Sequence, residues 1–354
     1  MLIETIFNSH HGMYNPPFEV YEGEKQPYME CPARIDNILG AITTAGLVEV
    51  HATRIQSEAL LMRVHSPEYV RFLKQFSAVT KGWAVPSIFP PQHSPTKDLG
   101  ALFGQYSFET STSVGPMTFD AAKKSADTAI TGAQEILRGR KTVYALCRPP
   151  GHHAERDKMG GYCYFNNSAL AAAQLADHGR VAILDLDAHH CNGTQSVFYE
   201  RSDVLTVSIH GDPSTCYPYF SGYASETGSG PGQGFNINLP VDPLLMTNTE
   251  YGLILNSALA SIRAFSPNYL VLSMGFDTYF NDPGAEFKLT TQAYEFIGFA
   301  VQSLDYPTLI VQEGGYDLES LGANAVSLLN GFNQNRIYTL GTLKPLLAPK
   351  QGNS

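Results

Sequence analysis

The stretch that decides the fold is RVAILDLDAHHCNG, residues 180–193. It begins with an apolar run, residues 181–184, of the kind that forms a strand buried on both faces of a sheet. The polar residues that follow this run are Asp185, Asp187, His189 and His190. Because side chains alternate along a strand, the first three are expected on one face, as a chelating edge requires. A helix-capping turn would explain one aspartate, but several acids and imidazoles at a buried strand end indicate a cation or a dense hydrogen-bond network.

The composition is that of a globular protein long enough to bury a substantial core, with 354 residues of which 43% are hydrophobic and 16% charged. The formal net charge of −10 argues against direct nucleic-acid binding, which needs a basic surface. The five cysteines are odd in number and scattered, as expected for reduced thiols. No apolar run approaches the ~20 residues of a membrane span, and the N-terminus does not resemble a signal peptide. We therefore expect a cytoplasmic protein that does not bind membranes.

Apolar runs typical of strands alternate along the chain with segments typical of helices, which predicts an α/β fold with a mainly parallel sheet. The predicted strands are residues 2–7, 142–146, 181–184, 204–210, 270–273 and 308–311. The predicted helices include residues 32–46, 121–137 and 168–177, the last of them capped by Asn166 or Asn167. No break in composition divides the chain, so residues 1–354 are expected to form a single domain.

Residues 82–117 interrupt this alternation. The segment contains five prolines, and its aromatic residues include Trp83, Phe89, Phe103, Tyr106 and Phe108. A long irregular segment in a compact domain is usually a functional loop or a disordered linker. Disordered segments are poor in aromatic residues, so we expect an inserted loop that covers a pocket or joins two subunits.

Polar side chains stand at the ends of five predicted strands. They are His152 and His153, Asp187 and His189, His210, Asp277, and Tyr316. In open α/β sheets the ligand crevice lies beyond the carboxyl ends of the strands, so these residues would meet there although they are far apart in sequence. One polar residue after one strand means little, but the recurrence predicts an active site.

Asp187, His189 and Asp277 supply two carboxylates and one imidazole nitrogen, a three-ligand set that leaves a coordination position open for water or substrate. Zinc fits this set, and its hard oxygen donors would also suit Mn or Fe(II). A metal with an open position polarises a carbonyl group and lowers the pKa of bound water to roughly 7. The set therefore predicts hydrolysis of an amide or an ester.

The tandem pair His152 and His153 could be a loop or helix-cap feature, as isolated histidine pairs usually are. Beside a metal, one imidazole would be the general base for water and the other the acid for the leaving amine. Asp185 and Asn192 are placed to orient the pair. An aspartate raises the basicity of its imidazole, whereas an asparagine only holds its orientation, so the two pKa values are expected to differ.

The sequence Gly314-Gly315-Tyr316 could be an ordinary surface turn. Behind a strand end in this set, the hydroxyl of Tyr316 is instead a candidate donor to the oxyanion that develops opposite the metal. The two glycines would let the loop approach the site closely.

Through these residues the chain resembles the arginase-like metal amidohydrolases that include the zinc histone deacetylases, and within them the acetylpolyamine amidohydrolases. The motifs are RPPGHHAERDKMGGYCYFNN (148–167), DLDAHHCNGTQ (185–195), VSIHGDPSTCYPYFSGYASETG (207–228), MGFDTY (274–279) and EGGYD (313–317), with a weaker ECPARID (30–36). Together they span nearly the whole chain. The resemblance implies a three-layer αβα fold, one zinc ion per chain and a homo-oligomer, either dimer or tetramer.

The resemblance also implies roles for individual residues. Asp187, His189 and Asp277 would bind zinc. His152 and His153 would act as base and acid, with Asp185 and Asn192 as their partners. Tyr316 would stabilise the tetrahedral intermediate. The substrate tunnel would include Tyr162, Tyr217, Gly161 and Gly314, with Arg34 near an internal acetate channel. A structural potassium ion would be held by Asp185, the main-chain carbonyls of Asp187 and His189, and Ser208 and Ile209.

Cys191 departs from the resemblance, because the family usually has glycine there. If the position needs a positive φ, a Cβ atom would cost about 1 kcal/mol and the loop would sit differently.

We therefore expect a zinc-dependent deacetylase that acts on an N-acetylated primary amine on a flexible alkyl chain, either an acetylated polyamine or an acetyl-lysine side chain of a protein. Glu109, Asp98 or Glu30 could receive a substrate ammonium, although a solvated surface is the favoured explanation for these acids. The alternatives are a histone-type lysine deacetylase, a catalytically weak protein that binds an acetylated ligand, and a ureohydrolase with a binuclear manganese centre.

Overall fold

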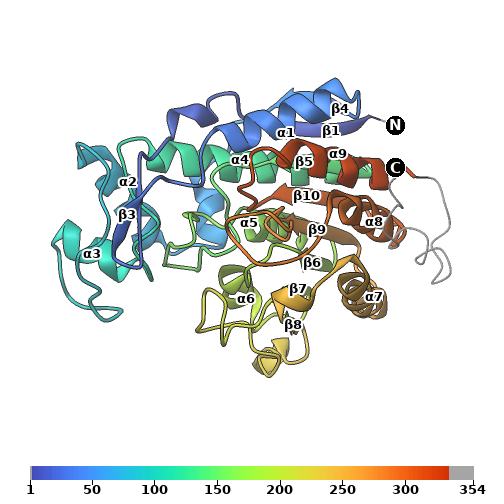
Figure 1. The fold of residues 1–354 in the computed structure, drawn as a ribbon. Helices are drawn as coiled ribbons and strands as arrows, with labels where there is room; N and C mark the ends of the chain where they lie inside the picture. The colour runs from blue at the N-terminus through green and yellow to red at the C-terminus, as the bar shows by residue number, and fades with distance from the viewer. Residues whose placement is uncertain (1, 335–354) are drawn as a thin grey trace.

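The computed structural model describes residues 2–334, and its centre is an eight-stranded sheet in which all neighbouring strands are parallel (Figure 1). The spatial order of the strands is β4-β1-β5-β10-β9-β6-β7-β8. Their bounds are β1 Ile3–Phe7, β4 Val48–Ala52, β5 Thr142–Leu146, β6 Val181–Asp185, β7 Val204–Gly211, β8 Asn236–Val241, β9 Tyr269–Met274 and β10 Thr308–Gln312. A separate antiparallel hairpin consists of β2 Glu19–Tyr21 and β3 Glu24–Gln26.

Helices cover both faces of the sheet, which confirms the predicted three-layer αβα fold (Figure 1). One face packs against α1 Ala33–Thr44, α7 Asn248–Phe265, α8 Thr291–Gln302 and α9 Leu321–Phe332. The other packs against α2 Pro67–Val79, α4 Thr118–Leu137, α5 Asn167–Leu175 and α6 Asn192–Phe198. In β5, Tyr144 and Leu146 enter the first core, whereas Val143 and Ala145 enter the second, so hydrophobic side chains point to both faces of this strand. No helix within residues 2–334 is long and apolar enough to cross a membrane.

The start of α5 positions the chain that carries the histidine pair. Of the two predicted caps, Asn166 is the one used, because its side chain accepts a hydrogen bond from the backbone N–H of Ala169 at 2.9 Å. Its Nδ2 donates to the carbonyl oxygen of Ala154 at 3.1 Å. The cap therefore ties the segment just after His153 to a helix of the second layer.

The segment 82–117, which was expected to be a loop, contains the helix α3 Leu99–Gln105. Phe103 of α3 packs on Phe72 and Phe76 of α2, with ring centroids 6.4 and 4.8 Å apart, and the two helices lie side by side (Figure 1). An antiparallel bridge joins the two ends of the segment. The loop prediction was wrong for α3, because its aromatic residues find partners on a neighbouring helix that sequence alone does not place there.

Candidate active site

The carboxyl ends of four central strands meet at one site. Strands β5, β10, β9 and β6 are consecutive neighbours in the sheet. The site residues that follow them are His152 and His153 after β5, Tyr316 after β10, Asp277 after β9, and Asp187 and His189 after β6. The structure thus brings these residues together at one edge of the sheet. His210 differs from the expectation, since it lies within β7 and its Nε2 is 2.8 Å from the carbonyl oxygen of Gly222.

Asp187, His189 and Asp277 form the candidate metal centre. One potential ligand atom of each lies within 4.8 Å of the others, and both carboxylates are buried. Nδ1 of His189 is 3.2 Å from Oδ1 of Asp187 and 3.1 Å from Oδ2 of Asp277. Burial and the charge of Asp187 raise the pKa of Asp277 to about 7. A divalent cation would compensate two carboxylates held this close together in the protein interior.

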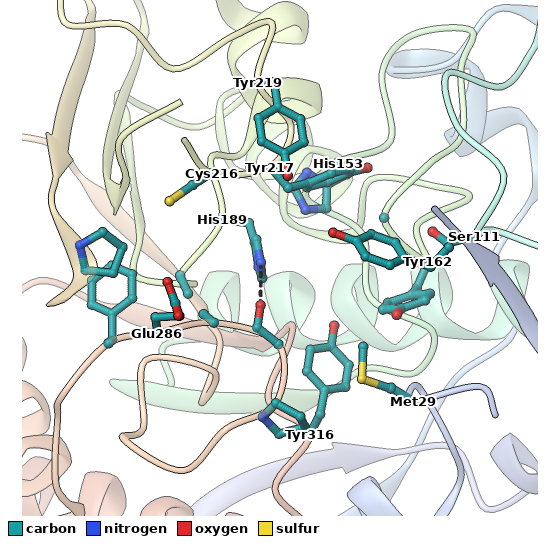
Figure 2. Close-up of a pocket in the computed structure, with 18 of the residues that line it drawn as sticks. Met29, Ser111, His153, Tyr162, His189, Cys216, Tyr217, Tyr219, Glu286 and Tyr316 are labelled. Atoms are coloured by element: carbon teal, nitrogen blue, oxygen red, sulfur yellow. Dashed lines mark hydrogen bonds between the residues drawn. The ribbon is translucent and has the colours of Figure 1, made fainter. Parts of the chain in front are cut away.

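The ring of His189 is oriented for a metal on its Nδ1 side. Its Nε2 lies 3.0 Å from the carbonyl oxygen of Gly284, which only accepts, so this nitrogen carries the proton (dashed line in Figure 2). The lone pair of the neutral ring is then on Nδ1, facing the two carboxylates. A metal-binding histidine commonly donates its other N–H in this way. The residues therefore fit a metal ion with two oxygen ligands and one nitrogen ligand.

The first three polar residues of the 180–193 stretch do not act as one chelating edge, contrary to the prediction. Strand β6 ends at Asp185, and Asp187 and His189 lie in the turn that follows. The carboxylate of Asp185 lies instead against His152, with Oδ2 3.3 Å from Nδ1. The strand alternation on which the prediction depended therefore stops before the metal ligands.

Backbone N–H groups hold the carboxylate of Asp187 in place. Oδ2 accepts from the N–H of Gly314 at 2.9 Å, and Oδ1 accepts from the N–H of His189 at 3.0 Å. A Cβ at position 314 would lie 2.6 Å from both Oδ2 of Asp187 and Oδ2 of Asp277, so only glycine lets this loop come so close. Gly314, which was predicted to bind substrate, thus contacts both candidate carboxylate ligands of the metal.

The histidine pair has two different partners, as the sequence predicted. Nδ1 of His152 is 3.3 Å from Oδ2 of Asp185, and Nδ1 of His153 is 2.7 Å from Oδ1 of Asn192. Burial alone would lower the pKa of His152, but the charges of Asp187 and Asp185 raise it to about 10. Burial and the charge of His152 lower the pKa of His153 well below its ordinary value. The pair therefore offers one protonated and one neutral imidazole at neutral pH.

A cavity of about 530 Å³ opens beside the candidate metal centre. His153, His189 and Tyr316 line it, together with the predicted tunnel residues Tyr162, Tyr217 and Gly161 (Figure 2). The rest of its wall includes residues outside the motifs, among them Tyr21, Gln26, Ser111 and residues 283–287. A Cβ at Gly161, whose φ is +56°, would come within 2.2 Å of the ring of His153, so the tunnel wall can touch the ring only with glycine there.

Tyr316 presents its hydroxyl group to this cavity (Figure 2). Its ring contacts the ring of Tyr162, 5.7 Å between centroids, and the guanidinium of Arg34, 4.8 Å from the ring centroid. Its backbone N–H donates to Oδ2 of Asp282 at 2.6 Å, which anchors the loop. Burial raises the pKa of Tyr316 well above its ordinary value, so the hydroxyl keeps its proton. The side chain is thus an oriented hydrogen-bond donor.

Glu30, one of the acids considered for a substrate ammonium, is fully buried and already paired. Its Oε1 accepts from Nη1 of Arg34 at 2.7 Å and from Nε of Arg148 at 2.8 Å. Arg34 also donates to the carbonyl oxygens of Glu313 at 2.6 Å and Gly315 at 2.5 Å. The role considered for Glu30 was therefore wrong, because its carboxylate is buried and its Oε1 is paired with two internal cations. Arg34 supports the loop that carries Tyr316.

The other two acids do not line the cavity either. Asp98 is the exposed N-cap of α3 and accepts from the N–H of Ala101 at 2.9 Å. Glu109 accepts from the N–H of Gly161 at 3.1 Å and so holds the wall of the cavity there. Among the described residues that line the cavity, the one outside the motifs with a carboxylate is Glu286, which the sequence reasoning did not single out.

Glu313 received no role from the sequence, yet it supports the histidine pair. Its carboxylate accepts from the N–H groups of Gly151 at 2.6 Å and His152 at 3.1 Å, and from the hydroxyls of Ser168 at 3.0 Å and Ser273 at 3.2 Å. Burial raises its pKa to about 7. The sequence pattern that could have identified Glu313 is an acid that follows a predicted buried strand.

Cys191 does not strain its loop. Its φ is −80° and its ψ is 60°, so the position does not need the positive φ that would favour glycine. The side chain is fully buried at the start of α6. The backbone cost considered for a cysteine at this position therefore does not arise.

Replacing Cys191 with glycine is expected to leave metal binding intact and to lower the free energy of unfolding by about 1–2 kcal/mol. Glycine frees the unfolded chain and removes a buried side chain. Metal analysis and denaturant unfolding measure the two effects, and Cys191→Ala, which restores the Cβ, should recover part of the stability. A large loss of bound metal in Cys191→Gly would contradict this account.

Comparison with known proteins shows the family to which the chain belongs. The family model of the histone deacetylase domain matches residues 28–332. The chain is 40% identical over 344 residues to acetylpolyamine amidohydrolase 2 of Pseudomonas aeruginosa, across 93% of this chain and 98% of that protein. It is 40% identical over 342 residues to the acetylpolyamine amidohydrolase of Mycoplana ramosa, across 93% and 99%. The crystal structure of an acetylpolyamine aminohydrolase from Burkholderia pseudomallei matches with a TM-score of 0.90 at 38% identity, covering 93% of this chain and 98% of that one. The chain therefore belongs to the histone deacetylase family of amidohydrolases, and within that family it is similar to the acetylpolyamine amidohydrolases.

Proposed function

We propose that this protein is a zinc-dependent deacetylase that removes the acetyl group from acetylated polyamines. The observation that carries the proposal is that a buried Asp–His–Asp set, a histidine pair and a tyrosine hydroxyl meet beside one cavity. The aromatic rings of Tyr162 and Tyr217 in its wall suit the methylene groups of a flexible alkyl chain. The names of relatives at 38–40% identity support a polyamine substrate.

A zinc ion held by Asp187, His189 and Asp277 would polarise the amide carbonyl and lower the pKa of water. His153 lines the cavity as a neutral imidazole and is the general base of the proposed reaction. His152 is its protonated neighbour, with ring centroids 4.0 Å apart, and is the proton donor of the pair, which reverses the order of base and acid that the resemblance implied.

Tyr316 completes this arrangement from the opposite loop. Its protonated hydroxyl faces the cavity and donates a hydrogen bond to the oxygen that gains negative charge in the transition state. Because Asp282 and Arg34 hold the backbone and the ring, this donor needs little reorganisation during the reaction.

We also propose a structural potassium ion and a homo-oligomer, both from the family resemblance. Asp185 and Ser208 are register partners on the adjacent strands β6 and β7, and Ile209 follows Ser208. The carbonyl groups of Asp187 and His189 belong to the turn after β6. A monovalent cation among these oxygens would compensate the buried Asp185.

Light scattering measures the oligomeric state and so tests the proposed homo-oligomer.

Glu286 supports a cationic substrate. It is exposed, and no lysine or arginine is among the described residues that line the cavity. Figure 2 shows Glu286 and Cys216 on the side of the cavity opposite Tyr162 and Ser111. A distal ammonium group on the substrate chain would find its one negative partner in the outer wall there, whereas a neutral chain would gain nothing from it.

Replacing Glu286 with glutamine is expected to raise KM for acetylputrescine roughly two- to fivefold and to leave kcat unchanged, since an exposed ion pair contributes little. KM for uncharged N-butylacetamide should not change, and the effect on acetylputrescine should shrink at high salt. Glu49→Gln, which changes an exposed acid on β4, is the control. An equal rise of KM for both substrates would contradict the role of Glu286.

The substrate assignment is tested by measuring turnover of acetylputrescine, acetylspermidine and an acetyl-lysine peptide on one sample, with its metal content. Faster turnover of the polyamines and one zinc per chain are expected. Equal or faster turnover of the peptide would make the protein a lysine deacetylase. Binding of all three without turnover would favour an acetyl-ligand-binding protein, and two metals per chain would favour chemistry of the ureohydrolase kind.

A further inference from the structure

The side-chain amide of Asn192 is held at both ends. Oδ1 lies 2.7 Å from Nδ1 of His153, and Nδ2 lies 2.9 Å from Oε1 of Glu155 and 3.3 Å from the carbonyl oxygen of His153. A carboxylate and a carbonyl only accept hydrogen bonds, so the NH₂ end of the amide must face them. Its oxygen end therefore faces the ring of His153.

This orientation decides which nitrogen of His153 carries a proton. Because Oδ1 of Asn192 only accepts, Nδ1 of His153 must donate, and the lone pair of the neutral ring is on Nε2. A ring that lines the cavity can use this lone pair to take a proton there. The reversed amide would place its NH₂ group against Nδ1 and favour a proton on Nε2. The lone pair of the ring would then be on Nδ1, bonded to Asn192, and Nε2 could not accept a proton.

We propose that Glu155 is a positioning residue that orients the amide of Asn192 and thereby fixes the tautomer of His153. The inference rests on the proposed function, because the tautomer matters for catalysis only if His153 moves a proton. Of the two acceptors that face the NH₂ group, Glu155 makes the shorter hydrogen bond and is the one that can carry a charge. The carbonyl oxygen of His153 is the weaker partner.

The backbone around Glu155 is braced, so its carboxylate is presented in one place. Its N–H donates to the carbonyl oxygen of Lys158 at 2.9 Å, and its own carbonyl oxygen accepts from Nδ1 of His65 at 2.9 Å. Nε2 of His65 accepts from the N–H of Asn166 at 2.9 Å. Burial lowers the pKa of His65 to about 4, so this ring stays neutral and keeps both bonds.

The start of α6 is packed against the same turn. The N–H of Thr194 donates to the carbonyl oxygen of His152 at 3.2 Å. A Cβ at Gly193 would come within 2.3 Å of the carbonyl oxygen of Ala154, so this close approach requires glycine. Asn192 and Glu155 therefore face each other from two segments that cannot easily separate.

The test compares Glu155→Met, which removes the acceptor at similar length, with Glu155→Gln, which retains an acceptor oxygen. In the zinc-loaded enzyme, Glu155→Met should lower kcat for acetylputrescine roughly 10- to 100-fold while KM and bound zinc stay unchanged. Glu155→Gln should stay within about threefold of the wild type. Asp157→Asn, in the same turn but bonded to Gln92, is the matched control and should have no effect. If Glu155→Met folds poorly, Glu155→Ala is used in its place to remove the acceptor.

A double variant separates positioning from a general loss of packing. If Glu155 acts through Asn192, Glu155→Met causes no further loss of kcat in an Asn192→Ala background. Losses that multiply would overturn the proposal, and so would an unchanged kcat in Glu155→Met.

A readout independent of turnover is the ¹⁵N NMR signal of the His153 ring in the histidine-labelled, zinc-loaded protein. The wild type and Glu155→Gln should show a proton on Nδ1, and Glu155→Met should shift the population toward Nε2–H. If no acetylated amine is hydrolysed but the tautomer responds to Glu155, the proposed function fails and the positioning role stands. A tautomer that does not respond overturns the positioning role.

Discussion

Replacing Asp277 with alanine is expected to reduce bound zinc from about one ion per chain to almost none, because the site loses one of three ligands and a negative charge. Deacetylase activity should fall at least roughly 1,000-fold, since Lewis-acid stabilisation of several kcal/mol is lost with the metal. Metal analysis of dialysed protein and turnover of acetylputrescine measure the two effects on one preparation.

Two controls separate the metal from the backbone support that Asp277 also gives. Oδ1 of Asp277 accepts from the N–H of Ala188 at 2.9 Å, and Asp277→Asn keeps an acceptor there while it removes the charge. This variant should fold like the wild type and bind zinc more weakly. Asp305→Asn, an exposed position, should change nothing. Wild-type protein stripped by a chelator should recover activity with added zinc, whereas an Asp277→Ala protein that keeps a full zinc ion would contradict the site.

Replacing Tyr316 with phenylalanine is expected to lower kcat roughly 100- to 1,000-fold, because the transition state loses one oriented hydrogen-bond donor. The ring remains, so its contacts with Tyr162 and with Arg34 should persist. KM and zinc content should therefore change little, which distinguishes a transition-state effect from lost binding. Steady-state kinetics with acetylputrescine and metal analysis measure these quantities.

Tyr219→Phe is the matched control for this variant, because Tyr219 also lines the cavity but is 51% exposed. It should keep kcat close to that of the wild type. If Tyr316→Phe retained full kcat, Tyr316 would be only a wall of the cavity, and the oxyanion role would have to be given to another group.

The sequence alone predicted the layers, the candidate metal ligands and the histidine pair, because each of these residues lies in a short local pattern at the end of an apolar strand. A strand buried on both faces is apolar along its length, so acids such as Asp187 and Asp277 directly after such strands stand out. Strand β8 was not predicted, because it lies at the edge of the sheet and carries buried polar residues, Asn236 and Asn238, in place of an apolar run. The same local reasoning failed for α3.

Only the tertiary structure decided which side chains meet at the site. The sheet places β10 and β9 between β5 and β6, an order that depends on how the whole domain packs. Glu30 was a candidate partner for a substrate ammonium, but it forms ion pairs inside the protein. No sequence pattern singled out Glu286 or Glu155, yet Glu286 lines the cavity and Glu155 accepts a hydrogen bond from Asn192. The physical reason is that periodicity reports on neighbours along the chain, while the partners of a side chain come from segments that only packing brings together.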